Sequence, residues 1–330
     1  MGVSAALGSS ALLPAGLGFR NTLTNGSFQV DQRNSSASQT ITSGAVLAYT
    51  ADRWYAYCTG ANVTGQRIAG SAPYQYNYQF TGATSNTLVG FGQRIEAANS
   101  FNYAGNTATL SANIKSSSLT SITWTLYYAT TTDTFGTIAS PTRTQIATGT
   151  FTISATLANY TAQIVVPAAA TTGLELVFTT GALIASQTLA FAGIQLEQNT
   201  KATPFEHRPI GAELELCQRY YEDSVTALSV ACSYSACLGV NTYVSAVFFK
   251  VPKRIVMTVL NGLTDGSGVL RLFDGVLSTV GSVALYRGGW AHPTAISADL
   301  HNTFGFSLTT TNSTMDAAMA WFRYTANAEL

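Results

Sequence analysis

The sequence predicts an all-β protein: an antiparallel β-sandwich or barrel, followed by a short helix and a second, smaller β-sandwich domain. Three observations predict it. Apolar and hydroxylated residues alternate with a period of two, turn-forming residues separate the alternating runs, and helical periodicity is almost absent. At 330 residues the chain is longer than a usual single domain, so two domains are expected.

The clearest alternating run lies in the middle of the first predicted domain, residues 21–209. Ile122, Trp124 and Leu126 fall on one strand face, while Thr123 and Thr125 fall on the other. The same pattern marks residues 110–114, 160–166, 174–178 and 190–196. Such strands bury one face and leave the other in contact with water.

One segment, residues 210–224, has helical spacing instead. Leu214, Cys217 and Tyr221 recur every three to four residues, and Pro209 precedes the segment. Because most amphipathic helices cover their own domain, packing against the first sandwich is favoured over packing against the same helix of a neighbouring subunit.

Strand-like alternation resumes in residues 225–330, which form the predicted C-terminal β domain. The runs cover residues 243–251, 255–260 and 317–324. At the other end, residues 1–20 are apolar but lack a basic region before the apolar part, so they are interpreted as an attachment arm instead of a signal peptide. No later window is apolar enough to predict a membrane span.

Charge argues against nucleic acid as a partner. Charged residues form 10% of the chain, with 16 Lys and Arg against 16 Asp and Glu. No basic cluster is longer than the Lys253-Arg254 pair, whereas nucleic-acid binding needs concentrated cations. The four cysteines are interpreted as free thiols, since they are few and scattered.

No catalytic constellation is present in the sequence, and the chain is predicted not to be an enzyme. The three histidines lack metal-ligand spacing, and no nucleophile motif occurs. No cofactor or metal is predicted. Two carboxylates that meet only in space would make a glycan hydrolase, a disfavoured alternative because the acids are few.

Several segments resemble the phage tail-fibre and virion proteins that carry jelly rolls like those of carbohydrate-binding modules. The resemblance is carried, in order along the chain, by residues 25–33, 50–54, 92–96, 195–209, 213–222 and 328–330. It is weaker over residues 225–300. Within these segments Asn25-Gly26 fits a turn, Arg53 and Glu197 are expected to pair, and Phe205 is expected to pin the chain against the sandwich.

This resemblance implies a structural component of a bacteriophage virion, a tail fibre or appendage that helps to attach to host-surface glycans. It also implies a homo-oligomer, with a trimer as the first expectation, that joins other virion proteins through residues 1–20. A capsid decoration or head-fibre protein without a host ligand is the alternative. Related jelly rolls often hold calcium, but Gln29 and Gln195 stand where acidic ligands are expected, so that site is not carried over.

Aromatic rings mixed with amides are the residues expected to bind glycans, since sugars stack on rings and pair with planar amides. The candidates are Trp54, Tyr55, Tyr74, Tyr76, Tyr78, Tyr286, Trp290 and His292. For each ring taken singly, packing within the core or between subunits is the favoured alternative.

Overall fold

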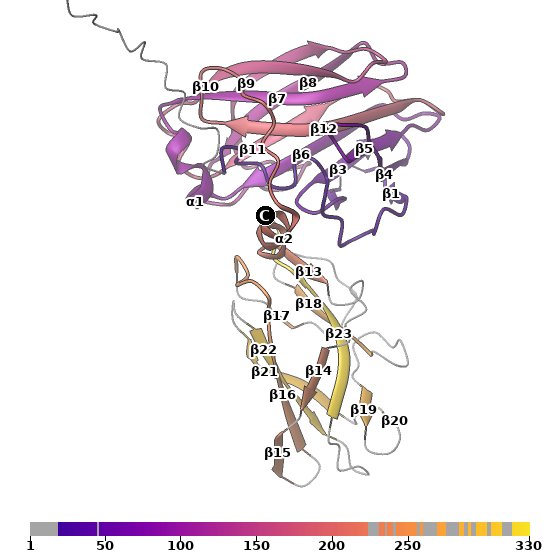
Figure 1. Ribbon diagram of the computed structural model, residues 1–330, viewed down its shortest axis with the longest axis vertical. Helices are drawn as coiled ribbons and strands as arrows, with labels where there is room; N and C mark the ends of the chain where they lie inside the picture. The colour runs from indigo at the N-terminus through magenta and orange to yellow at the C-terminus, as the bar shows by residue number, and fades with distance from the viewer. Residues whose placement is uncertain are drawn as a thin grey trace, which may run out of the picture.

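The computed structural model describes the backbone of residues 19–44, 46–223, 231–234, 236–239, 242–255, 258–259, 269–274, 284–286, 290–291, 295–301, 305–311 and 319–330. Side chains are described for residues 19–44, 46–223, 248–255 and 326–330. The fold is all-β, as predicted. A sandwich of two antiparallel sheets lies on one side of helix α2, and the later sheets lie on the other side (Figure 1).

Sheet A of the sandwich has six strands in the order β1-β4-β5-β12-β7-β10. Their bounds are β1 Gln39–Ile41, β4 Val63–Ala69, β5 Tyr76–Thr81, β12 Thr188–Glu197, β7 Thr107–Ser116 and β10 Ala158–Val165. The register of β12 on β7 shifts between Ala192 and Gln195, where a bulge places Gly193 at a φ of 51°.

Sheet B also has six strands, in the order β2-β3-β6-β11-β8-β9. They are β2 Ala48–Tyr49, β3 Tyr55–Thr59, β6 Leu88–Ile95, β11 Leu174–Thr179, β8 Ser121–Ala129 and β9 Arg143–Thr152. Helix α1 (Ala97–Ser100) and the 3-10 helix η1 (Phe101–Tyr103) connect β6 to β7. Most of these pairs join non-consecutive strands, which is the crossed connectivity of a jelly roll.

The predicted alternation decides which side chains fill the space between the sheets. On β8, Ile122, Trp124 and Leu126 are buried in the main core. Aromatic rings dominate its centre: Phe91 lies 4.9 Å from Trp54 and 5.5 Å from Tyr78, both in stacked geometry. Each buried ring of this size contributes about 1.5–3 kcal/mol through removal from water.

Helix α2 spans Ile210–Gln218, so the prediction of a helix to residue 224 is corrected. Tyr221–Asp223 form strand β13 instead, paired with β23 (Met319–Asn327). The backbone N–H of Ala328 donates to the Tyr220 carbonyl, 2.6 Å away. Pairing with a distant strand therefore determines the structure of Tyr221–Asp223, although their local spacing is helical.

The helix packs against its own sandwich, as expected from its pattern. Glu213 on α2 accepts the backbone N–H of Asn25 at 2.5 Å, and Cys217 is fully buried. Cys58 is buried too, and both described thiols are free.

The remaining strands form two further sheets. One has the order β17-β18-β23-β19-β20, with β13 and β14 also paired to β23, and the other has the order β15-β16-β22-β21. Their bounds are β14 Ala231–Tyr234, β15 Ala236–Gly239, β16 Thr242–Phe248, β17 Thr258–Val259, β18 Val269–Asp274, β19 Ala284–Tyr286, β20 Trp290–Ala291, β21 Ala295–His301 and β22 Gly305–Thr311. The pair β17 and β18 is parallel, while the other strand pairs of the described chain are antiparallel.

Three predictions can be compared with these strands. The runs at 243–251 and 317–324 correspond to β16 and β23, shifted by a few residues, and only Thr258–Val259 is a strand within 255–260. Residues 1–18 of the predicted arm, like His292, lie outside the described residues. Among the described residues, no helix is long and apolar enough to cross a membrane.

Candidate functional site

The outer face of sheet B is closed by aromatic side chains. Tyr55 and Tyr57 on β3 pair in register with Gly92 and Gly90 on β6. Their rings lie directly on these glycines: a Cβ built at Gly90 would stand 2.1 Å from Cζ of Tyr57, and one at Gly92 would stand 2.6 Å from the Tyr55 hydroxyl oxygen. A side chain at either position would collide with a ring, and at Gly92 also with the Leu176 carbonyl oxygen, 2.5 Å from the built Cβ.

A buried ion cluster completes the closed face. The Glu175 carboxylate is fully buried, accepts from Nε of Arg94 at 2.8 Å, and also pairs with Arg143. The Tyr55 hydroxyl donates to the same carboxylate at 2.6 Å. Each charge has an opposite partner, which is the condition under which ions are tolerated away from water.

A second ion cluster lies at the junction between the sandwich, α2 and residues 328–330. The Glu329 carboxylate pairs with Arg53 and, at 3.2 Å, with Arg33. The Leu330 carbonyl accepts from Nη1 of Arg94 at 2.8 Å and from the Tyr49 hydroxyl at 2.9 Å. Figure 1 shows the C-terminus beside α2, next to the sandwich.

The predicted pair of Arg53 and Glu197 is therefore wrong. Arg53 pairs with Glu329, whereas the Glu197 carboxylate accepts from the backbone and hydroxyl of Thr203, both at 2.8 Å, and from Gln195 at 3.0 Å. Residues close in sequence supply the hydrogen bonds of Glu197. The partner of Arg53 is Glu329, which lies far away in the sequence.

The segments that carry the resemblance converge at this junction. The Gln93 side chain accepts the backbone N–H of Thr24, and Glu96 pairs with Arg219. These contacts add to those already described for Asn25, Arg53 and Glu329. Gln195 accepts the backbone N–H of Glu206 at 2.9 Å. The scattered segments thus form one buried polar network. Its described side chains make hydrogen bonds and ion pairs with other groups of the protein.

The outer face of sheet A differs, because it holds an open groove of about 550 Å³. Its floor comes from Ser111 and Asn113 on β7 and Asn159 on β10. Its wall comes from residues 202–207, the segment that crosses from β12 to α2 and that we name the strap. The complete lining is Pro73, Tyr74, Ser111, Asn113, Asn159, Ala202, Thr203, Pro204, Phe205 and His207.

Three rings form one end of the groove. Phe205 lies edge-on to Tyr74 at 5.6 Å and to His207 at 5.0 Å. Phe205 therefore fixes the strap against the sandwich, as predicted from the sequence. It is half-buried and His207 is exposed, so part of this aromatic wall faces the groove.

Tyr74 is held in place from two sides. Its ring lies over the bulge residue Gly193, where a built Cβ would stand 2.2 Å from Cε1, and its hydroxyl accepts from Nδ2 of Asn113 at 2.7 Å. Burial raises the pKa of this hydroxyl, so it stays protonated. Because the oxygen already accepts one bond, its proton remains available for a further acceptor.

The lining combines apolar rings with uncharged polar groups. Among the residues that the structure describes, it contains no carboxylate, lysine or arginine. An apolar wall beside amides and hydroxyls suits an uncharged ligand that has both C–H faces and hydroxyls.

The structure places the predicted glycan-binding residues in unlike surroundings. Trp54 and Tyr55 are 0% exposed and Tyr78 is 2% exposed, so these rings have no face free for a sugar. Their assignment as candidates is corrected, because they pack in the core or on the closed face. Tyr76 is half-buried, with the Arg67 guanidinium 4.4 Å above its ring.

Of the other candidates, Tyr74 alone lines the groove among the residues with described side chains. Tyr286 lies on β19 and Trp290 on β20, paired with each other in register, and their side chains lie outside the described part, as does His292. Asn113, Asn159 and His207 also line the groove but were not among the residues predicted from the sequence. Their strand positions were foreseeable, but their meeting depends on the order of strands in sheet A.

No protein-family model and no curated protein sequence matches the chain. Similar solved structures include a family 4 carbohydrate-binding module, at 16% identity over 53% of this chain and 98% of that chain, with a TM-score of 0.32. Another is a module in complex with β-1,4-galactotriose, at 10% identity, 55% and 100% coverage and a TM-score of 0.34.

A third similar structure is the enzymatically active domain of tailspike protein 4 of bacteriophage CBA120. Identity is 14%, the TM-score is 0.32, and the match covers 55% of this chain and 22% of that one. These likenesses concern the sandwich fold alone.

Proposed function

We propose that this chain is a non-catalytic structural protein of a bacteriophage particle, a tail fibre or tail appendage, and that its sandwich binds host-surface glycan in the groove on sheet A. The proposed divisions are an attachment arm at 1–20, the jelly roll at 21–209, a linking helix after it and a C-terminal β domain at 225–330. Assembly as a homotrimer belongs to the same proposal.

The groove is the observation that carries the binding part. A cavity of about 550 Å³ with an aromatic wall, an amide floor and no fixed charge matches an uncharged saccharide better than a peptide or an anion. The described lining residues include no carboxylate, which supports binding without hydrolysis, since glycoside cleavage uses a pair of acids.

Low charge supports the virion part, together with the resemblance of the junction segments to tail-fibre proteins. A chain with 10% charged residues can bury its surface against other copies without desolvating many ions. The junction network supports a structural role for those segments, because their described side chains bond one another.

Substitutions in the groove test glycan binding. The full chain is applied to an array of uncharged and acidic oligosaccharides, and the tightest uncharged ligand is titrated by calorimetry. Phe205→Ala and Asn159→Ala should each weaken its binding by about fivefold to tenfold, the loss expected for one ring or amide contact of about 1 kcal/mol.

Two exposed residues outside the groove supply matched controls. Phe248→Ala and Asn99→Ala remove the same groups elsewhere and should leave affinity unchanged. A chain that retains no sugar on the array, or groove variants that bind as well as the controls, would overturn the glycan assignment.

Cryo-microscopy of the intact particle tests the virion part. A tail position supports the fibre, whereas a capsid position favours the alternative of a decoration or head-fibre protein. Light scattering on the purified chain tests the oligomer: a trimer has three times the 34.8 kDa mass of one chain.

A further inference from the structure

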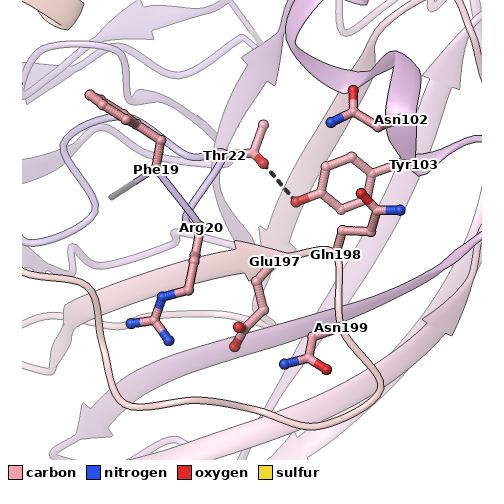
Figure 2. A pocket seen from close by; sticks show the side chains of 8 residues that line it. All are labelled: Phe19, Arg20, Thr22, Asn102, Tyr103, Glu197, Gln198 and Asn199. Carbon is pink, nitrogen blue, oxygen red and sulfur yellow. Dashed lines mark hydrogen bonds between the residues drawn. The ribbon is translucent and has the colours of Figure 1, made fainter. Parts of the chain in front are cut away.

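A second hollow lies close to the groove, across the strap. Its volume is about 250 Å³, and Figure 2 draws the side chains that line it. They are Phe19, Arg20, Thr22, Asn102, Tyr103, Glu197, Gln198 and Asn199. Thr203 separates the two cavities: it lines the groove, and its hydroxyl accepts from Nη1 of Arg20 at 2.8 Å.

Several polar groups of this hollow are available for a ligand. The amides of Asn102 and Gln198 are exposed and make no hydrogen bond to the described part of the chain. The Arg20 guanidinium donates to Thr203 and, at 3.4 Å, to the Pro204 carbonyl. Guanidinium groups have five N–H donors, so donors remain for a ligand.

An exposed ring stands at the edge of the same hollow. Phe19 is 63% exposed, and its ring contacts the Arg208 guanidinium at 5.3 Å. Large apolar side chains exposed at this level are few in the described sandwich, and this one lines the same hollow as the two amides. A ring beside planar amides is the combination that sugars need for stacking and hydroxyl pairing.

The charges of the hollow balance. Arg20 is the one arginine of the described sandwich, residues 19–209, without a carboxylate oxygen within 4.0 Å. The Glu197 carboxylate lines the hollow as well, but Thr203 and Gln195 occupy its oxygens. One cation and one anion give no net charge, so neither an acidic nor a basic ligand is favoured.

The hollow continues into a neighbouring depression of about 360 Å³, which shares Gln198 and Asn199 with it. Gly105, Asn106, Thr107 and Thr200 complete that depression. The amide-lined trough is therefore longer than the first hollow alone, with room for a ligand to extend beyond it.

We propose that this hollow is a second saccharide site, which binds one uncharged hexose or N-acetylhexosamine unit of a glycan. Phe19 supplies the stacking ring, Asn102 and Gln198 pair with hydroxyl or acetamido groups, and Arg20 donates to a sugar oxygen. The inference shares its ligand class with the proposed function but rests on residues that do not line the groove.

Two sites on one sandwich would hold a polysaccharide by avidity. When one repeat occupies the groove, the tethered chain presents other repeats to the hollow at a high effective concentration, so weak sites give tight overall binding. A long polymer should consequently bind more tightly than its separate units.

Saturation-transfer NMR on the full chain tests the second site with glucose, galactose, mannose and N-acetylglucosamine as probes. Phe19→Ala and Gln198→Ala should each reduce the signal of the binding sugar in the Phe205→Ala background, where the groove is impaired, by about threefold or more. Asn99→Ala in that background is the control and should change nothing. Both substituted residues are exposed, and thermal unfolding checks that the variants stay folded.

The outcomes separate the two proposals. A sugar signal that persists in Phe205→Ala and falls when Phe19→Ala or Gln198→Ala is added supports the second site. If Phe205→Ala by itself abolishes the sugar signal, or if Phe19→Ala and Gln198→Ala leave the signal of the Phe205→Ala chain unchanged, the second site is overturned while the groove stands. No signal from any of the four sugars in the parent and in Phe205→Ala would also overturn it.

Discussion

The two outer faces of the sandwich carry similar residue types but differ in what covers them. On sheet B, Tyr55 and Tyr57 lie flat on glycines, and a fully buried carboxylate holds two arginines. On sheet A, Tyr74 lies on a glycine too, yet the floor beside it is open. The ring alone does not make a binding site, because the strands and loops that surround it decide whether a ligand can reach it.

The closed face should lose most stability when its charge balance is broken. Glu175→Gln leaves Arg94 and Arg143 buried without a counterion, which costs about 3–5 kcal/mol of unfolding free energy. Urea unfolding measures the change. Glu215→Gln on the exposed side of α2 is the control and should have little effect. A loss below about 1 kcal/mol for Glu175→Gln would mean that water reaches the closed face.

A pH series tests whether the junction resembles the closed face in excluding water. Asp52 lies at this junction, because its carboxylate accepts from Nε2 of Gln32, which also donates to the Tyr221 carbonyl. Burial raises the pKa of Asp52 from 3.8 to about 6, although Arg33 and bonds from Gln32 oppose the shift. A raised folded-state pKa means that folding takes up a proton, so this contribution to stability is complete below pH 3.8 and is lost as pH rises through 6.

The shift from 3.8 to about 6 corresponds to about 3 kcal/mol. The difference in unfolding free energy between the wild type and Asp52→Asn should therefore move by up to that amount in favour of the wild type as pH falls from 7 to 4. Because other carboxylates titrate equally in both chains, the difference isolates this group. A flat difference would show that Asp52 is solvated.

An added methyl group distinguishes a glycine beneath a ring from one in open space. Gly90→Ala would place a Cβ 2.1 Å from the Tyr57 ring and should cost about 1–3 kcal/mol. Gly211→Ala, near the start of α2, meets nothing within 4 Å and should be neutral or slightly stabilising. Equal melting temperatures for the two variants would show that the Tyr57 ring can move aside.

The smallest effects come from removing one hydroxyl on each face. Tyr55→Phe loses a bond to the buried Glu175 carboxylate and should cost about 2 kcal/mol without changing glycan affinity. Tyr74→Phe loses the bond from Asn113 and should cost about 1 kcal/mol or less, while it weakens glycan binding in the groove. Calorimetric titration and urea unfolding on both variants measure this opposite pattern, and identical behaviour would erase the distinction between the faces.

Local patterns were enough to predict the strands but not the site. Ile122, Trp124 and Leu126 alternate with threonines, and their face of β8 is buried because period two maps directly onto a half-buried strand. Asn113 and Phe205 are far apart in the chain, and they share a groove only because β7 lies beside β12 and the strap returns across them. The local sequence does not predict which strands lie side by side in the sheet.

The same limit explains why the ring assignments of Trp54, Tyr55 and Tyr78 failed. Trp54 and Tyr55 lie in a run rich in aromatic residues. The sequence pattern of such a run is the same whether its rings are buried in protein or exposed to water. Register decided the matter for Tyr55, since its partner Gly92 leaves space for the ring to lie flat. Likewise, Arg53 found its carboxylate 276 residues later, beyond the reach of spacing rules.

That distance has a consequence for synthesis in the cell. Every strand of the sandwich has left the ribosome once residue 197 has emerged, but the buried guanidinium of Arg53 gains its counterion only after residue 329 has been translated. At about 5–20 residues per second, the unfinished sandwich waits several seconds with this cation uncompensated. Nascent chains should therefore resist protease poorly until residue 329 has emerged.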